Sequence, residues 1–195
     1  MLGIYDKTVY ARKCIVKELT SSEGKSFFNA THIQGNCQSS KRIGLIYDGK
    51  LVAAMSFGYR RKITNGRRSD GEYELLRFST QLGYHVVGAA GKLLAWFERT
   101  MHPKSLLSYA DRRWSIGKLY NALGFKLDHV SAPNYWYLTK NDCKRLYRYA
   151  FRKSRLPKLL TKFDSSKTEI ENMLANGYNY IWDCGNYVFL KTYDM

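Results

Sequence analysis

Apolar residues recur along this chain with the periods of strands and of helices, and the two kinds of segment alternate. Thr20 offers a helix N-cap with Glu23 in the first turn. Farther on, Asp48-Gly49 separates two apolar runs, which is a strong signal for a β-hairpin. The strands predicted in this way lie at 13–18, 42–47, 51–59, 73–79, 105–110 and 130–138, and the helices at 20–32, 86–101 and 115–123.

The last quarter of the chain differs in character. Residues 140–162 hold nine Lys or Arg and one Asp, a net charge of +8 in 23 residues, with aromatic residues interleaved. Farther on we expect a helix at 169–175 and a pair of strands within 178–190. The chain is therefore divided into an N-terminal extension, a core and a basic C-terminal extension packed on the core, with bounds at 1–12, 13–139 and 140–195.

Small residues gather where the helix at 86–101 is expected to start. The first-turn N–H groups of a helix are free, and together with the helix dipole they form a binding site for a pyrophosphate. Glycine and alanine let such a ligand approach the backbone closely. The same small residues would also allow helix and sheet to pack tightly, and the local pattern alone leaves both interpretations open. The residues concerned are His85, Val86, Val87, Gly88, Ala89, Ala90, Gly91 and Lys92.

A second motif follows the next strand. Residues 119–125 read Leu-Tyr-x-x-x-Gly-Phe and lead into a strand, and this resembles the GNAT acyltransferase family. The small-residue segment fits that family's Gln/Arg-x-x-Gly-x-Gly/Ala pattern at Gly88 and Ala90, with His85 at the first position. The resemblance implies an α/β (α+β) GNAT-like fold, a mixed and mostly antiparallel sheet flanked by helices, here with a basic C-terminal helical and strand extension.

The GNAT resemblance also implies roles for individual residues. It assigns acetyl-CoA or a related acyl-CoA to the helix start, and no metal. The tyrosine that matches Tyr120 would protonate the departing thiolate, for which a phenol with a pKa near ~10 is suited. A glutamate on the strand before the helix would be the base, and Glu74 lies on that strand. Tyr120 could instead be a packing ring, and Glu74 an ordinary exposed carboxylate.

Four further stretches resemble a narrower group, the phage-encoded proteins similar to the Mom family of adenine-modifying transferases. They lie at 73–78, 108–115, 133–137 and 181–186. This resemblance implies a protein that modifies a base in DNA and so shields phage DNA from restriction. Asp111 would then orient or deprotonate the amine, and Tyr109 is included with it as a catalytic candidate. The alternative for Asp111 is an ion pair with a neighbouring arginine.

The net charge of +16 favours a polyanionic partner. Arginine can clamp phosphates, and aromatic rings suit a base flipped out of a duplex, so the expected partner is double-stranded DNA and not a membrane. Because Tyr135, Trp136 and Tyr137 alternate on a predicted strand, at least one face of that triplet is expected to be core. A one-sided run of charge is less typical of a merely solvated face than alternating charges are. The residues expected to contact DNA are Arg60, Arg61, Lys62, Arg67 and Arg68 in a loop at 60–71, and Arg112, Arg113, Trp114, Tyr135, Trp136, Lys144, Arg145, Arg148, Arg152 and Lys153.

Cysteine and histidine spacing and hydropathy narrow the class of protein further. The four cysteines form no CxxC pair, so we expect no structural metal site. We expect the cysteines to be reduced thiols. Without a long apolar run or a leader-like start, the protein is expected to be cytoplasmic, in the host cell if phage-encoded. Two other functions stay open. One is a non-catalytic DNA-binding protein of the same fold associated with phage homing endonucleases, and the other is an acetyltransferase of a protein or small amine. The sequence leaves a homodimer open as well.

Overall fold

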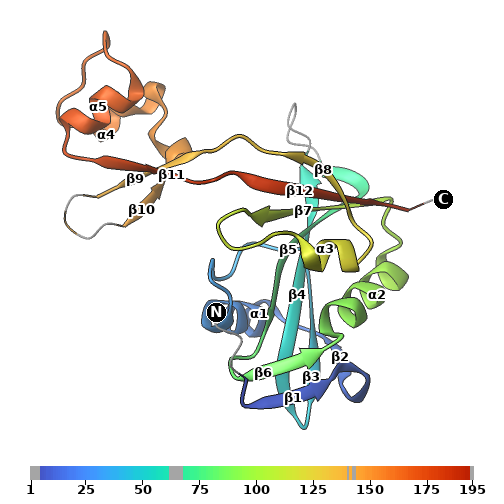
Figure 1. Cartoon of the computed structure of the whole chain (residues 1–195). Helices are drawn as coiled ribbons and strands as arrows, with labels where there is room; N and C mark the ends of the chain where they lie inside the picture. The colour runs from blue at the N-terminus through green and yellow to red at the C-terminus, as the bar shows by residue number, and fades with distance from the viewer. Residues whose placement is uncertain (1–4, 62–67, 140, 142–143, 194–195) are drawn as a thin grey trace. The chain divides into compact units, whose positions relative to one another are not determined.

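The structure is a computed structural model that describes residues 5–61, 68–139, 141 and 144–193 (Figure 1). The helices are α1 Ser21–Thr31, α2 Ala89–Met101, α3 Lys118–Ala122, α4 Leu156–Leu159 and α5 Glu169–Ala175, with 3-10 turns η1 Ala11–Lys13, η2 Arg148–Phe151 and η3 Lys153–Arg155. The strands are β1 Lys7–Tyr10, β2 Ile15–Glu18, β3 Lys41–Tyr47, β4 Lys50–Arg61, β5 Arg68–Thr80, β6 Tyr84–Val87, β7 Ser105–Asp111, β8 Lys126–Val130, β9 Tyr135–Leu138, β10 Arg145–Tyr147, β11 Asn179–Trp182 and β12 Asn186–Thr192.

The chain forms two compact units. The first unit holds the described residues up to Ala110, Ile116–His129 and those from Tyr187 onward, and the second holds Asp111–Ser115 and Val130–Asn186. The expected divisions at residues 12 and 139 differ from these units, because the described residues before 13 share the first unit with the core and Asp111–Ser115 belong to the second. Strand β9 belongs to the second unit although it precedes residue 139, and β12 belongs to the main sheet although it follows. Strand β12 lies between β7 and β8, and β9 pairs with β11 as well as with the neighbouring β10, so distant partners place both strands and local pattern does not reveal them.

A seven-stranded mixed sheet, in the order β2-β3-β4-β5-β7-β12-β8, is the frame of the first unit. Strands β2 to β5 pair antiparallel, and β5 pairs parallel with β7. Helices α1 and α2 lie on opposite sides of this sheet (Figure 1). The alternation along β4 explains why, because Ala54 belongs to the cluster with Phe27 and Phe28 of α1, whereas its neighbours belong to the cluster of α2.

Several local predictions are confirmed by the geometry of turns and caps. Thr20 and Glu23 form a reciprocal capping box at the start of α1, with Glu23 N–H donating to Thr20 Oγ1 at 3.2 Å. Asp48 and Gly49 both have positive φ, 51° and 69°, as a two-residue hairpin turn requires. The helix expected at 169–175 is α5, which a second capping box opens at Thr168.

Three local predictions need correction. Val86 and Val87, expected to open the helix at 86–101, belong to strand β6, because Tyr84–Val87 pairs in parallel with Lys7–Tyr10. The strand expected at 130–138 is two strands, β8 and β9, separated by Ser131–Asn134 around a proline. The loop expected at 60–71 is partly strand, since β4 reaches Arg61 and β5 begins at Arg68; Lys62 and Arg67 lie outside the described residues.

A three-stranded sheet in the order β10-β9-β11 forms the frame of the second unit. Both outer strands pair antiparallel with β9. Tyr135, Tyr137, Leu156 and Met173 form its buried core, so one face of the sheet packs against helices α4 and α5.

Candidate active site

Strand β5 has a bulge at the place where its parallel pairing with β7 ends. The antiparallel register with β4 passes from Arg77 to Leu75, so Leu76 is an extra residue in the strand. The parallel pairing of β5 with β7 ends at Leu75 and Ser108, although both strands continue beyond these residues. Beyond this point β5 and β7 no longer pair with each other. The carbonyls of Leu76 and Tyr109 accept side-chain hydrogen bonds instead, from Arg77 Nη1 at 2.7 Å and from Tyr120 Oη at 3.4 Å.

Tyr120 places its hydroxyl at this point. Its Oη is 3.1 Å from Ser108 Oγ, on the last paired residue, and 3.4 Å from the carbonyl oxygen of Tyr109, the first unpaired one. Its ring stacks on Phe189 of β12 with centroids 4.7 Å apart. Burial raises the pKa of Tyr120, an effect that the hydrogen bond with Ser108 partly offsets, so the phenol keeps its proton at neutral pH.

Helix α3 begins just after Gly117, a residue to which the sequence pattern assigned no role. Gly117, the N-cap of α3, has φ 81°, and a Cβ there would lie 2.3 Å from Phe189 Cζ. Only glycine satisfies both the left-handed backbone and this close approach. Gly117 thus fixes the ring on which Tyr120 stacks.

Glu74 and Tyr109 lie on the other face of the sheet from Tyr120. Glu74 is opposite Leu107 in the parallel register, and Tyr109 follows Leu107 by two residues, so their side chains share a face. Tyr109 is 48% exposed. Burial and then the charge of Glu74 raise the pKa of Tyr109, and Arg60 opposes this rise. Glu74 and Tyr109 therefore lie near each other on one face of the sheet, and the Tyr120 ring lies on the other face.

Asp111 belongs to the second unit, where Arg113 holds its carboxylate. Arg113 donates to it from Nε at 3.0 Å and from Nη2 at 2.5 Å. This side-chain hydrogen bonding is the main reason that the pKa of Asp111 is lowered. A carboxylate held in this way is a weak base, so the ion pair that the sequence left as an alternative is the arrangement found.

The start of α2 has the features expected of an anion site. Gly88 is the N-cap and has φ 77°. The first hydrogen bond of the helix runs from Lys92 N–H to the Gly88 carbonyl. The N–H groups of Ala89, Ala90 and Gly91 therefore come before the first intrahelical hydrogen bond. Gly91 is exposed and nothing lies within 4 Å of where its Cβ would be. No acidic residue occupies the first turn. These residues fit a pyrophosphate.

Other residues expected at this site have structural contacts. Lys92 Nζ donates to the carbonyls of Ala11 and Cys14, at 3.0 and 2.6 Å, and so ties η1 to α2. His85 stacks on Tyr5, with ring centroids 4.9 Å apart. Val86 is buried and Val87 is 37% exposed.

The turn η1 brings in two cations that the sequence reading missed. Arg12 and Lys13 are exposed and lie between the carbonyls that Lys92 binds, so they stand beside the start of α2. Arg12 was expected in the N-terminal extension at 1–12, and Lys13 in the strand at 13–18. Only the pairing of β1 with β6 brings this part of the chain to the helix, and no local signal indicated it.

The second unit gathers most residues expected to contact DNA. Trp114 is 66% exposed, and Lys144, Arg145, Arg148 and Lys153 are exposed as well. Arg112 donates to the carbonyl of Cys184 at 3.0 Å. Tyr135 corrects the expectation: at 4% exposure it belongs to the core and does not offer its ring to a base.

The described residues offer neither a cluster of metal ligands nor a membrane-spanning helix. No group of three or more His, Cys, Asp or Glu side chains in this part of the chain could hold a metal ion. None of the described helices has the length and apolar character that crossing a bilayer requires.

Comparisons with known proteins show the fold. No family model matches the chain, and no curated protein matches it in sequence. Among solved structures, the ribosomal-protein-S18-alanine N-acetyltransferase of Escherichia coli is similar, with 11% identity and a TM-score of 0.52 over 93% of this chain and 95% of that one. An N-acetyltransferase of Staphylococcus aureus has 11% identity and a TM-score of 0.51 over 92% and 98% of the two chains.

A third similar structure was solved with a ligand. An acetyltransferase of Bacillus subtilis in complex with CoA has 11% identity and a TM-score of 0.50 over 93% of this chain and all of that one. Together with the strand order and the flanking helices, these likenesses show that the chain has the mixed, mostly antiparallel α+β fold of the GNAT acetyltransferases.

Proposed function

We propose that this protein is an acyl-CoA-dependent transferase whose acceptor is a base in DNA. The observation that carries the transferase part is the position of Tyr120 Oη, beside the residues where the pairing of β5 with β7 ends. The CoA complex of the similar Bacillus subtilis structure supports the choice of donor. The resemblance to the Mom family supports adenine as the base and protection of phage DNA in the host cytoplasm as the purpose.

The donor would be held through its phosphates. The free N–H groups of Ala89, Ala90 and Gly91 would bind the pyrophosphate, and Arg12 and Lys13 would add charge beside it. An acyl-CoA supplies an acyl group activated as a thioester, whose sulfur takes a proton as the acyl group leaves.

Proton movements then fall to residues on both faces of the sheet. Tyr120 Oη holds a proton that its raised pKa keeps in place at neutral pH, as a general acid requires. Glu74, on the opposite face beside Tyr109, would take the proton of the acceptor amine.

DNA as the acceptor rests on charge and on aromatic side chains. The whole chain carries +16, and Trp114 and several arginines lie exposed in the second unit. A polyanion is the partner that such a surface attracts.

The test is nucleoside analysis. Purified protein is incubated with acetyl-CoA and DNA, and the digested DNA is examined by mass spectrometry for a nucleoside that carries the acyl group. We expect a modified deoxyadenosine, and Tyr120→Phe to slow its formation by about 10²- to 10⁴-fold.

The matched control is Tyr193→Phe. Tyr193 donates a partly buried hydrogen bond to Glu98 Oε1 at 2.6 Å in the same unit, so this variant loses a comparable bond outside the Tyr120, Ser108 and Tyr109 group and should keep its rate. Unmodified nucleosides from folded protein would refute DNA modification, and acyl transfer to a protein or small amine without DNA would establish the alternative acceptor.

A further inference from the structure

One face of the three-stranded sheet in the second unit is aromatic and open. In the antiparallel register Trp136 of β9 lies opposite Tyr147 of β10 and Ile181 of β11, so the three side chains share a face. Tyr147 is 55% exposed and Ile181 49%. The opposite face, with Tyr137, is filled by the core.

The rings on this side form a short row. Trp136 and Tyr147 have centroids 5.3 Å apart, and Tyr147 and Tyr149 follow at 6.4 Å with planes 30° apart. Tyr149 is 58% exposed. Tyr147 and Tyr149 are each more than half exposed, so their rings offer surface on which planar groups can stack.

Arginines accompany the rings. The guanidinium of Arg145 lies 5.8 Å from the Trp136 ring centroid, and that of Arg152 lies 4.1 Å from the Tyr149 centroid. Arg148 lies over the buried Tyr135 at 4.3 Å. Each cation is thereby kept beside an aromatic face, which is the arrangement that a backbone phosphate next to a stacked base needs.

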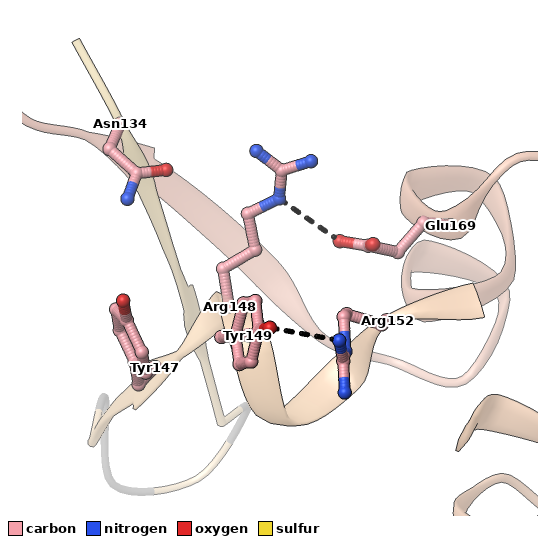
Figure 2. A pocket seen from close by; sticks show the side chains of 6 residues that line it. All are labelled: Asn134, Tyr147, Arg148, Tyr149, Arg152 and Glu169. Atoms are coloured by element: carbon pink, nitrogen blue, oxygen red, sulfur yellow. Dashed lines mark hydrogen bonds and ion pairs between the residues drawn. The ribbon is translucent and has the colours of Figure 1, made fainter. Parts of the chain in front are cut away.

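A pocket continues the row beyond Tyr147 (Figure 2). Its volume of 280 Å³ is just under the ~300 Å³ at which small-molecule sites begin, so it suits one base or phosphate. Figure 2 shows Tyr149 between Tyr147 and Arg152, with Glu169 across from Arg148. The lining residues are Asn134, Tyr147, Arg148, Tyr149, Arg152 and Glu169.

The pocket keeps hydrogen-bond donors available. Arg148 uses its Nε toward Glu169 Oε1, at 3.4 Å, and neither of its Nη atoms bonds to a residue that the structure describes. Arg152 uses Nη1 toward the Tyr149 hydroxyl, at 3.0 Å. Its Nε is buried without an acceptor among the described residues. Two guanidinium groups against one carboxylate favour an anionic ligand.

We infer that this face of the second unit binds a single-stranded nucleic acid, with bases stacked on Trp136, Tyr147 and Tyr149 and phosphates on the neighbouring arginines. In a duplex the base faces are covered by their neighbours, so exposed rings beside arginines fit an unpaired strand better. The inference rests on the proposed function in taking nucleic acid as the partner, but it adds which form is bound and where.

The experiment measures binding without any acyl donor. Fluorescence anisotropy follows three labelled probes of about 12 nucleotides, within the site sizes of single-strand binders. They are a mixed-sequence single strand, the same sequence as a duplex, and an abasic strand of equal length. We expect the single strand to bind about tenfold more tightly than either of the others.

Variants of Tyr147 separate stacking from charge. Tyr147→Ala should weaken binding of the base-bearing strand roughly tenfold and leave the abasic strand within about twofold, and Tyr147→Phe should restore binding because the ring is retained. The matched control is Tyr10→Ala in the first unit. Tyr10 is 47% exposed, and the guanidinium carbon of Arg12 lies 5.2 Å from its ring centroid. Thermal unfolding verifies that each variant is folded.

The outcomes distinguish this inference from the proposed function. Three results would overturn it. The duplex could bind as tightly as the single strand or more tightly, Tyr147→Ala could weaken binding of the base-bearing and abasic strands equally, or the protein could bind none of the probes. Single-strand binding that depends on Tyr147, in a protein that modifies no nucleoside, would support it while the transferase proposal fails. Modified nucleosides with binding unaffected by Tyr147→Ala would do the reverse.

Discussion

At the scale of single residues, burial and hydrogen bonding set the protonation states of Tyr120 and Asp111. Tyr120 is stacked on Phe189 and its hydroxyl is hydrogen-bonded, so its neutral form is favoured. Asp111 is the opposite case, because Arg113 stabilises its charged form. Neither environment is visible in local sequence, since Phe189 lies 69 positions from Tyr120 and rotamers decide whether Asp111 pairs with Arg113.

His32 gives a residue-scale prediction for stability. Burial, and then the charge of Arg77, lower its pKa from 6.5 to about 4, and its Nδ1 accepts a hydrogen bond from Gln34 N–H at 3.1 Å. Because the folded pKa is below the unfolded one, His32 contributes stability above pH 6.5 that is lost as pH falls toward 4. His32→Gln should reduce the loss between pH 7 and 4.5 by an amount on the order of 2 kcal/mol, discounted for partial exposure.

Urea denaturation at the two pH values measures this difference. The exposed His129 supplies the control, since His129→Gln removes an imidazole without removing a buried one. A pH dependence identical in wild type and His32→Gln would show that His32 does not carry it.

At the scale of elements, the first turn of α2 provides a prediction for donor binding. An aspartate at position 91 would interact favourably with the helix dipole, by about 0.3–1 kcal/mol, and would repel a pyrophosphate bound there. Nothing within 4 Å opposes a side chain at this position. Gly91→Asp should therefore raise the free energy of unfolding and weaken CoA binding roughly tenfold.

Calorimetric titration with CoA and denaturant unfolding test the two effects together. Gly91→Ala is the matched control, because it removes the glycine's conformational freedom without adding charge, and should stabilise the fold by about 0.5–1 kcal/mol with CoA affinity retained. If Gly91→Asp binds CoA as wild type does, the start of α2 is not the phosphate site.

Elements were predictable where their cause is local. The capping box at Thr20 and Glu23 and the Asp48-Gly49 hairpin depend on residues a few positions apart. Strand β6 was not predicted, and its last two residues were assigned to the following helix, because its partner β1 lies in the segment regarded as an extension. Strand β9 was joined to β8 because the sequence does not show that it pairs with β10 and β11 instead.

At the scale of the whole molecule, the +16 charge predicts salt-dependent binding of nucleic acid. Each phosphate neutralised on a single strand contributes about −0.7 to the slope of log K against log salt. Replacing Arg145, Arg148 and Arg152 by Gln should therefore make that slope shallower by about 2. Lys25, Lys50 and Arg99, exposed in the first unit, form the control triple with the same loss of charge.

Anisotropy titrations with single-stranded DNA at several salt concentrations measure the slope for each protein. An equal change in both triples would mean that net charge alone governs binding. A slope unaltered in the first triple would mean that these arginines contact no phosphate.

The sequence by itself determined the local caps and turns, the approximate places of most core elements, and the basic, aromatic character of the last quarter. The GNAT fold was reached only through a resemblance carried by short motifs, which the strand order then confirmed. The tertiary structure alone decided that Arg12 and Lys13 stand beside α2, that Tyr135 is core while Trp136 and Tyr147 share an open face, and that Tyr120 reaches the end of the β5–β7 pairing. The physical reason is strand pairing, because pairing register sets which face a side chain occupies. The pairs β1–β6 and β5–β7 join segments distant in sequence, and the pair β9–β10 joins neighbouring ones.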